Sequence, residues 1–129
     1  MTIVVGCTTK PEGRAALSRA IAEAQAQGED LVALNVSSGE SYADPKVATE
    51  DELDEVRSAL AEAGVDGEVR QLVRGKAAAD ELLSVADDLS ASLVVIGLRR
   101  RTPVGKFVLG SVSQEVLLNA AMPVLAVKA

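Results

Sequence analysis

The sequence contains no histidine and no tryptophan, and it has one cysteine, one phenylalanine and one tyrosine in 129 residues. Without histidine the chain cannot form Ser-His or Cys-His nucleophile pairs, and it lacks the commonest zinc ligand and general base. The single cysteine, Cys7, excludes an internal disulfide and any multi-cysteine metal site. With so few aromatic residues, the core must be built from Val, Leu, Ile and Ala.

Long apolar runs are also absent. None approaches the ~20 residues that a membrane span requires, and no basic stretch precedes the first apolar segment as in a signal peptide. We therefore expect a cytoplasmic protein that does not enter a membrane. The formal net charge of −6 disfavours nucleic-acid binding, because an acidic surface repels backbone phosphates.

Apolar runs of strand length alternate with stretches of helical periodicity along the whole chain. We predict strands over residues 2–7, 31–36, 68–73, 93–96 and 124–127. Four helices are predicted. The first begins at a Thr9–Glu12 capping box and ends at Gly28, and the second runs from a Thr49–Glu52 capping box to Gly64. The third spans residues 77–89, and the fourth begins at Ser111. This alternation predicts parallel strands joined by right-handed crossovers. It favours one α/β domain over residues 1–129.

The segment after the fourth predicted strand concentrates positive charge and glycine. Residues 97–113 contain four cations, Arg99, Arg100, Arg101 and Lys106. Ligands of open parallel sheets bind beyond the carboxyl ends of the strands, and a helix N-terminus such as the one at Ser111 favours anions. A phosphate site is one interpretation; a simple Ser111 N-cap beside a solvated basic loop is the other. The segment lacks the pattern of a Walker A motif.

The stretch from Val94 to Val127 resembles the C-terminal half of a universal stress protein domain. It reads Val-Val-Ile-Gly, twelve residues, Gly-Ser-Val-Ser-Gln-Glu-Val-Leu, and later Met-Pro-Val-Leu-Ala-Val. The family carries Gly, two residues, Gly, nine residues, Gly and then Ser or Thr, followed by a helix and a Pro-Val-Leu strand. The resemblance covers essentially the whole chain. It implies an α/β Rossmann-like open parallel sheet of five strands in the order 3-2-1-4-5, with four helices on both faces.

The resemblance also implies a regulatory domain that binds ATP or another adenine nucleotide, with accompanying Mg²⁺ as an open option. Nucleotide-binding members hold the phosphates at the Gly/Ser loop and the adenosine near the first, second and fourth strands. The matching phosphate-side positions are Gly97, Gly110, Ser111, Val112 and Ser113. Ile96 and Val36 match the adenine side, and Arg99 and Arg100 would add cationic phosphate contacts.

Two residues depart from the family pattern. Arg100 stands where the family has its second loop glycine, and a side chain there is costly if the position needs a positive φ or close backbone approach. Thr8 stands where nucleotide binders have an Asp at the end of the first strand. The alternative function is therefore a nucleotide-free protein-interaction module of the same fold. We expect no enzyme, although weak ATP hydrolysis stays open, and the regulatory partner protein is unknown.

The last strand predicts a homodimer. The resemblance places it at the edge of the sheet, and its apolar sequence of Val124, Leu125, Ala126 and Val127 offers an unpaired row of backbone groups. Antiparallel pairing of two copies would give a closed two-fold contact. Alternatively, the Arg-rich loop or the last helix could cover this edge within one monomer.

Overall fold

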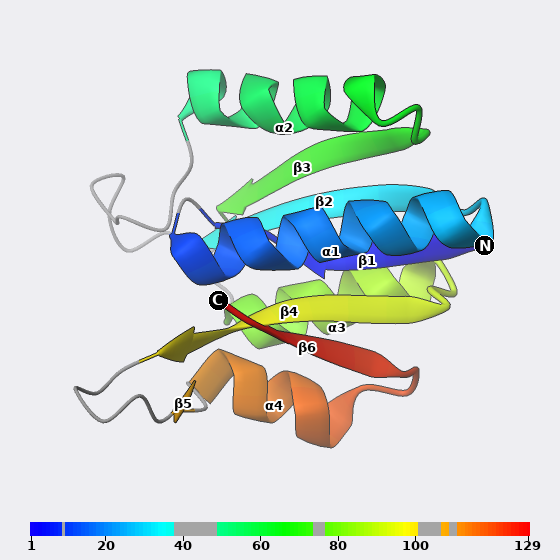
Figure 1. The fold of residues 1–129 in the computed structure, drawn as a ribbon. Coiled ribbons are helices and arrows are strands. Elements are labelled where there is room, and N and C mark those ends of the chain that lie inside the picture. The colour runs from blue at the N-terminus through cyan, green and yellow to red at the C-terminus, as the bar shows by residue number, and fades with distance from the viewer. Residues whose placement is uncertain (9, 38–48, 74–76, 101–106, 109–110) are drawn as a thin grey trace.

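A sheet of five parallel strands runs through the middle of the molecule (Figure 1). The computed structural model describes residues 1–8, 10–37, 49–73, 77–100, 107–108 and 111–129. The parallel strands are β1 (Thr2–Gly6), β2 (Asp30–Ser37), β3 (Gly67–Val73), β4 (Leu93–Arg100) and β6 (Val124–Lys128). They lie in the order β3-β2-β1-β4-β6, which confirms the predicted order 3-2-1-4-5 of an open α/β sheet.

Helices cover both faces of this sheet, as predicted (Figure 1). The helices α1 (Pro11–Gln27) and α2 (Glu50–Glu62) pack on one face, and α3 (Ala78–Asp88) and α4 (Ser111–Asn119) on the other. Alternate residues of β1 serve the two layers: Ile3 and Val5 pack with α1, and Val4 packs with α3 and α4. Burial on both faces explains why the central strands β1 and β4 contain continuous apolar runs.

The helix α1 approaches the sheet closely because its inner face is built from small residues. Ala16, Ala20 and Ala24 are all buried, and Gly28 ends the helix with a φ of 65° as expected of a left-handed C-cap. The helix begins differently from the prediction. Its N-cap is Lys10, which makes no side-chain cap hydrogen bond, so the predicted Thr9–Glu12 capping box is wrong; Thr9 itself lies outside the described residues.

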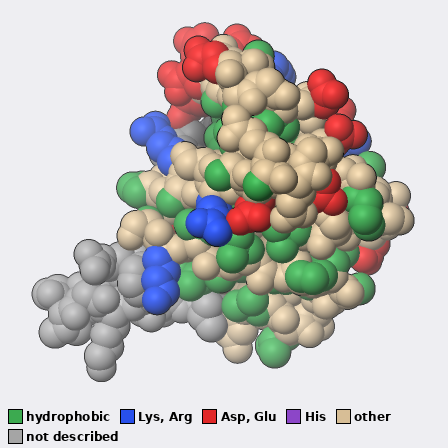
Figure 2. All heavy atoms as spheres, turned by 45° about the vertical axis from the view of Figure 1, so that its right-hand side comes forward, with side chains coloured by type: hydrophobic (Ala, Val, Ile, Leu, Met, Phe, Trp, Pro, Cys, Tyr) green, Lys and Arg blue, Asp and Glu red, His purple; other side chains and the backbone are tan. Residues whose placement is uncertain are grey.

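The second predicted capping box is present at the start of α2. The Thr49 Oγ1 accepts a hydrogen bond from the Glu52 N–H at 3.2 Å, and the Glu52 Oε1 accepts one from the Thr49 N–H at 3.0 Å. Acidic side chains gather at the top of the molecule in Figure 2, over this helix. Much of the chain's negative charge thus lies on α2.

The strand β4 extends further than the sequence indicated. It was predicted over residues 93–96, closed by Gly97, but it continues to Arg100 and pairs there with β5 (Phe107–Val108), an unpredicted antiparallel strand. Gly97 does not end the strand because Gly97 and Leu98 pair with β6, and the two residues after them pair with β5. Part of the predicted basic loop is therefore a short two-stranded ladder.

A buried amide links β1, β2 and β3 at their carboxyl ends. The Asn35 side chain is fully buried, and its Nδ2 donates to the Cys7 carbonyl at 3.0 Å. Its Oδ1 accepts a hydrogen bond from Gln71 Nε2 at 3.1 Å. Asn35 thereby satisfies the Cys7 carbonyl at the point where the chain leaves β1.

Replacing Asn35 should therefore cost more than an ordinary surface change. We expect Asn35→Ala to lower the free energy of unfolding by about 2 kcal/mol, because a buried carbonyl loses its donor. Urea denaturation followed by circular dichroism measures the change. Asn119→Ala is the matched control, since the exposed Asn119 side chain bonds only within its own helix, to the Glu115 carbonyl. Equal effects of the two changes would show that the Asn35 link contributes nothing.

Candidate functional site

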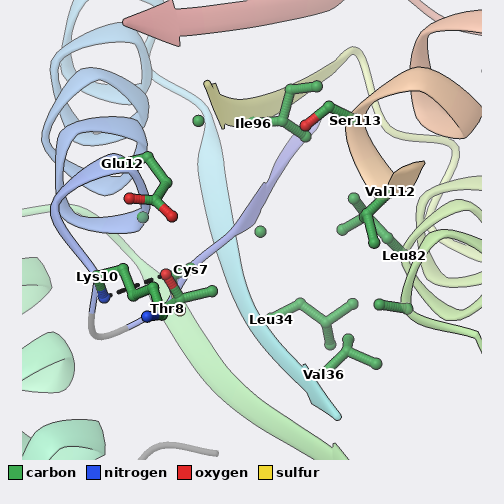
Figure 3. A pocket seen from close by; sticks show the side chains of 14 residues that line it. Cys7, Thr8, Lys10, Glu12, Leu34, Val36, Leu82, Ile96, Val112 and Ser113 are labelled. Carbon is green, nitrogen blue, oxygen red and sulfur yellow. Dashed lines mark hydrogen bonds between the residues drawn. The ribbon is translucent and has the colours of Figure 1, made fainter. Parts of the chain in front are cut away.

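A pocket of about 160 Å³ opens at the carboxyl ends of β1, β2 and β4 (Figure 3). The chain crosses from β1 to β2 in one direction along the sheet, and β4 lies on the other side of β1. Such a reversal of strand order separates the two crossover connections and leaves a crevice between them. The topology of the fold thus places this pocket.

One wall of the pocket is apolar. Its residues come from two strands and two helices: Leu34, Val36, Ile96, Ala78, Leu82 and Val112. In Figure 3, Leu34, Val36, Leu82 and Val112 lie on one side of the cavity, and Ile96 lies beside Ser113 at its top. Leu34, Leu82 and Ile96 also belong to the core between the sheet and α3 and α4. The wall is therefore a continuation of the core, and it suits a flat apolar group.

The opposite wall is polar and comes from the turn between β1 and α1. Thr8, Lys10 and Glu12 line it, and all three are partly buried. The Thr8 Oγ1 accepts a hydrogen bond from the Lys10 N–H at 3.3 Å (dashed in Figure 3). Ser113, in the first turn of α4, adds a hydroxyl from the far side. Among the described lining residues, Lys10 is the one cation and Glu12 the one carboxylate.

Two glycines let the backbone of α1 lie directly against this site. A Cβ on Gly97 would collide with the carbonyl oxygen of Glu12, and a Cβ on Gly13 would collide with the Oγ1 and backbone of Thr8. Neither glycine has a positive φ. Their role here is close approach of backbone to backbone, and it fixes the first turn of α1 against β1 and β4.

Cys7 also lines the pocket, with 6% of its surface exposed. Burial raises the pKa of its thiol to about 11, and a backbone hydrogen bond offsets this rise only in part. The thiol is therefore neutral at pH 7. A neutral, buried thiol behaves as a small core side chain and not as a nucleophile.

The pocket brings together most of the residues that the sequence analysis proposed for the site. These are Thr8, Val36, Ile96, Gly97, Val112 and Ser113. Gly110 lies outside the described residues. Arg99 and Arg100 lie in β4 and Ser111 is the first residue of α4, but their side chains lie outside the described part.

The backbone conformation at Arg100 shows that this position does not need a positive φ, which was one reason to expect a glycine there. Arg100 lies in the extended strand β4, opposite Phe107 of β5. It is not among the described residues with a positive φ, of which Ser90 is the one that is not a glycine. A side chain at this position therefore meets no conformational penalty.

Sequence reasoning missed several lining residues. Lys10, Glu12 and Gly13 follow β1, and the rule that directed attention to the loop after β4 applies equally to the loop after β1. Leu34, Ala78 and Leu82 carried no signal of their own, since they read as ordinary core positions. One signal could have pointed to Lys10: it directly precedes the proline that begins a helix, and lysine is a poor N-cap residue.

No group of three or more His, Cys, Asp or Glu side chains among the described residues could hold a metal ion. None of the helices described is long and apolar enough to cross a membrane.

Comparison with known proteins identifies relatives over the full length. The universal stress protein family matches residues 1–128. A universal stress protein of Mycolicibacterium smegmatis is 45% identical over 126 residues, which cover 98% of this chain and 96% of the relative.

Solved structures with the same fold include proteins crystallised with nucleotides. A universal stress protein from Archaeoglobus fulgidus has a TM-score of 0.84 and 31% identity, covering 99% of this chain and 98% of its own. A complex with dAMP from the same organism gives 0.80 and 28%, with the same coverage. A universal stress protein in complex with cAMP gives 0.76 and 28%, covering 99% of this chain and 96% of its own.

The contact between Gly97 and α1 gives a test of how the site is built. We expect Gly97→Ala to lower the free energy of unfolding by about 2 kcal/mol, because the new methyl group forces α1 away from β4. Chemical denaturation measures this loss. Gly6→Ala is the matched control: it lies in the same pocket, yet the nearest atom to its new Cβ is 3.7 Å away on Leu82. If both variants unfold like the wild type, the close approach at Gly97 is not a constraint.

Proposed function

The chain belongs to the universal stress protein family, and we propose that it binds an adenine nucleotide in the pocket and acts as a regulatory domain. The pocket itself carries the proposal: an apolar slot faces a polar rim at the point where the strand order reverses. The slot between Leu34, Val36 and Leu82 suits a purine ring. The rim of Thr8, Lys10 and Ser113 suits a ribose and a phosphate.

The ligands of the related structures indicate which nucleotides the pocket would bind. The two nucleotides named for proteins 28% identical to this chain, dAMP and cAMP, share an adenine and a single phosphate. We therefore propose adenine monophosphates beside ATP. With ATP, Mg²⁺ would accompany the polyphosphate. The phosphate would lie at the N-terminus of α4, where the backbone near Val112 and Ser113 favours an anion.

We propose binding and not catalysis as the main activity. The chain has no histidine, and Glu12 is the single carboxylate among the described lining residues. Glu12 lies in the first turn of α1. A pair of groups that could act as acid and base is therefore missing from this part of the pocket.

One observation favours the alternative of a nucleotide-free interaction module. The Thr8 hydroxyl accepts the Lys10 N–H, so one of its two lone pairs is already in use, and it carries no charge to hold a ligand. In that case the pocket would be vestigial, and the domain would act through its surface.

Ligand titration separates these two functions. We expect AMP, cAMP or ATP to shift the amide resonances of Ile96, Gly97, Val112 and Ser113 in a titration followed by NMR. Ala78→Phe should abolish the shifts by filling the slot, whereas Ala121→Phe, at an exposed alanine outside the pocket, should leave them unchanged. No shifts at millimolar ligand, and no adenine compound retained after native purification, would favour the interaction module.

We further propose that two copies pair through β6. This strand lies at the edge of the sheet (Figure 1), and Val124, Leu125, Ala126 and Val127 are each only partly buried. The side of β6 away from β4 faces no other strand of the described chain. A two-fold antiparallel contact would satisfy its backbone groups.

The register of β6 decides which backbone groups are available for this pairing. The Val94 N–H donates to the Pro123 carbonyl at 3.0 Å. In a parallel ladder alternate residues point toward the same neighbour, so Leu125 directs its N–H to β4. Ala126 directs its N–H to the free edge.

Two proline substitutions therefore have opposite expected effects. Ala126→Pro should shift a dimer toward monomer in sedimentation velocity while the circular dichroism stays native, because it removes an outward N–H. Leu125→Pro should lower the stability of the monomer by about 3 kcal/mol, because it removes a donor within the sheet. A wild-type protein that sediments as a monomer at micromolar concentration would refute the β6 interface.

A further inference from the structure

We propose that Lys10 makes the pocket select a phosphate-bearing ligand over an uncharged nucleoside, an inference that rests on the nucleotide binding proposed above. Lys10 is the N-cap of α1 and lines the polar wall of the pocket. A helix N-cap position favours a residue other than lysine, whereas a pocket for a phosphate-bearing ligand favours a cation. We base the inference on this difference.

As a helix cap, Lys10 is a poor choice. Ser, Thr, Asp and Asn are preferred at this position because their side chains accept a hydrogen bond from the first turn, and Lys10 provides no such bond. A positive charge at a helix N-terminus is also disfavoured by the helix dipole. The rest of the helix start follows the rules, with Pro11 as the first helical residue and Glu12 in the first turn.

Ion pairing does not account for Lys10 either. Within the part of the chain that the structure describes, its ammonium group makes no ion pair with a carboxylate. Its backbone N–H donates to Thr8 Oγ1, but any residue other than proline could make that bond. Local rules of this kind are broken mainly at functional sites, and the side chain of Lys10 lies at one.

In the pocket, the charge of Lys10 has a clear consequence. Glu12 lines the same wall, and its carboxylate would repel a phosphate. Without Lys10, the described lining would therefore carry a net negative charge. With Lys10 it is neutral overall, so the charge of Lys10 across the pocket would offset that of Glu12 for a phosphate at the N-terminus of α4 while the base occupies the apolar slot.

Three variants separate the role in the helix from the role in the pocket. Lys10→Ser replaces the cation with a good cap, Lys10→Met removes the charge without adding a cap, and Glu12→Gln removes the opposing charge. For each we would measure the affinities for AMP and for adenosine by calorimetry at low salt, and the Tm without ligand.

We expect Lys10→Ser and Lys10→Met to weaken AMP binding about five-fold, the scale of a partly exposed charge pair, and to weaken adenosine binding less than this. Lys10→Ser should at the same time raise the Tm by about 3 °C through the new cap, so that stability and affinity change in opposite directions. Glu12→Gln should strengthen AMP binding. Added salt should reduce the preference of the wild type for AMP.

The outcomes distinguish this inference from the function on which it rests. A wild type that binds neither AMP nor adenosine would overturn the proposed function and the selectivity of Lys10 together. If both ligands bind and the Lys10 variants weaken them equally or not at all, only the inference about Lys10 fails.

Discussion

The first turn of α1 lies directly on the backbone of the sheet, and the shape of the pocket depends on this contact. Gly97 of β4 faces the Glu12 carbonyl, and Gly13 faces the backbone of Thr8, with no room for a methyl group at either place. The buried alanines of α1 continue the same close approach along the helix. If α1 stood at the usual distance of a helix with large inner side chains, Lys10 and Glu12 would lie further from the apolar wall.

This contact gives Gly97 a structural role in addition to the ligand-binding role that the sequence suggested. The resemblance placed Gly97 among the phosphate-side residues, and it does line the pocket. Its nearest constraint, however, is the carbonyl of Glu12 within the same chain. A glycine in a ligand motif can thus be required by helix packing, as in dinucleotide-binding folds where one glycine serves close helix–strand packing.

The sequence predicted the fold better than the site, for physical reasons. Strands buried on both faces are long apolar runs, and helices between them show their own period, so the five parallel strands, four helices and their order could be predicted with the help of the family motif. Thr8, Val36 and Ile96 were found through the family resemblance, which matches them to positions near the ends of the first, second and fourth strands. Lys10 and Glu12 were missed because their place in the pocket depends on how closely α1 packs, and β5 was missed because two residues carry no period.

A ligand in the pocket would also stabilise the folded chain. Leu34, Leu82 and Ile96 belong at once to the apolar wall and to the core beneath α3 and α4, so a base in the slot would extend that core. A ligand that binds only the folded chain stabilises it in proportion to the logarithm of its concentration over its dissociation constant. The same base would touch β2, β4, α3 and α4 together, while Lys10 would bring in α1. Occupancy of one small site would therefore be felt by elements on both faces of the sheet.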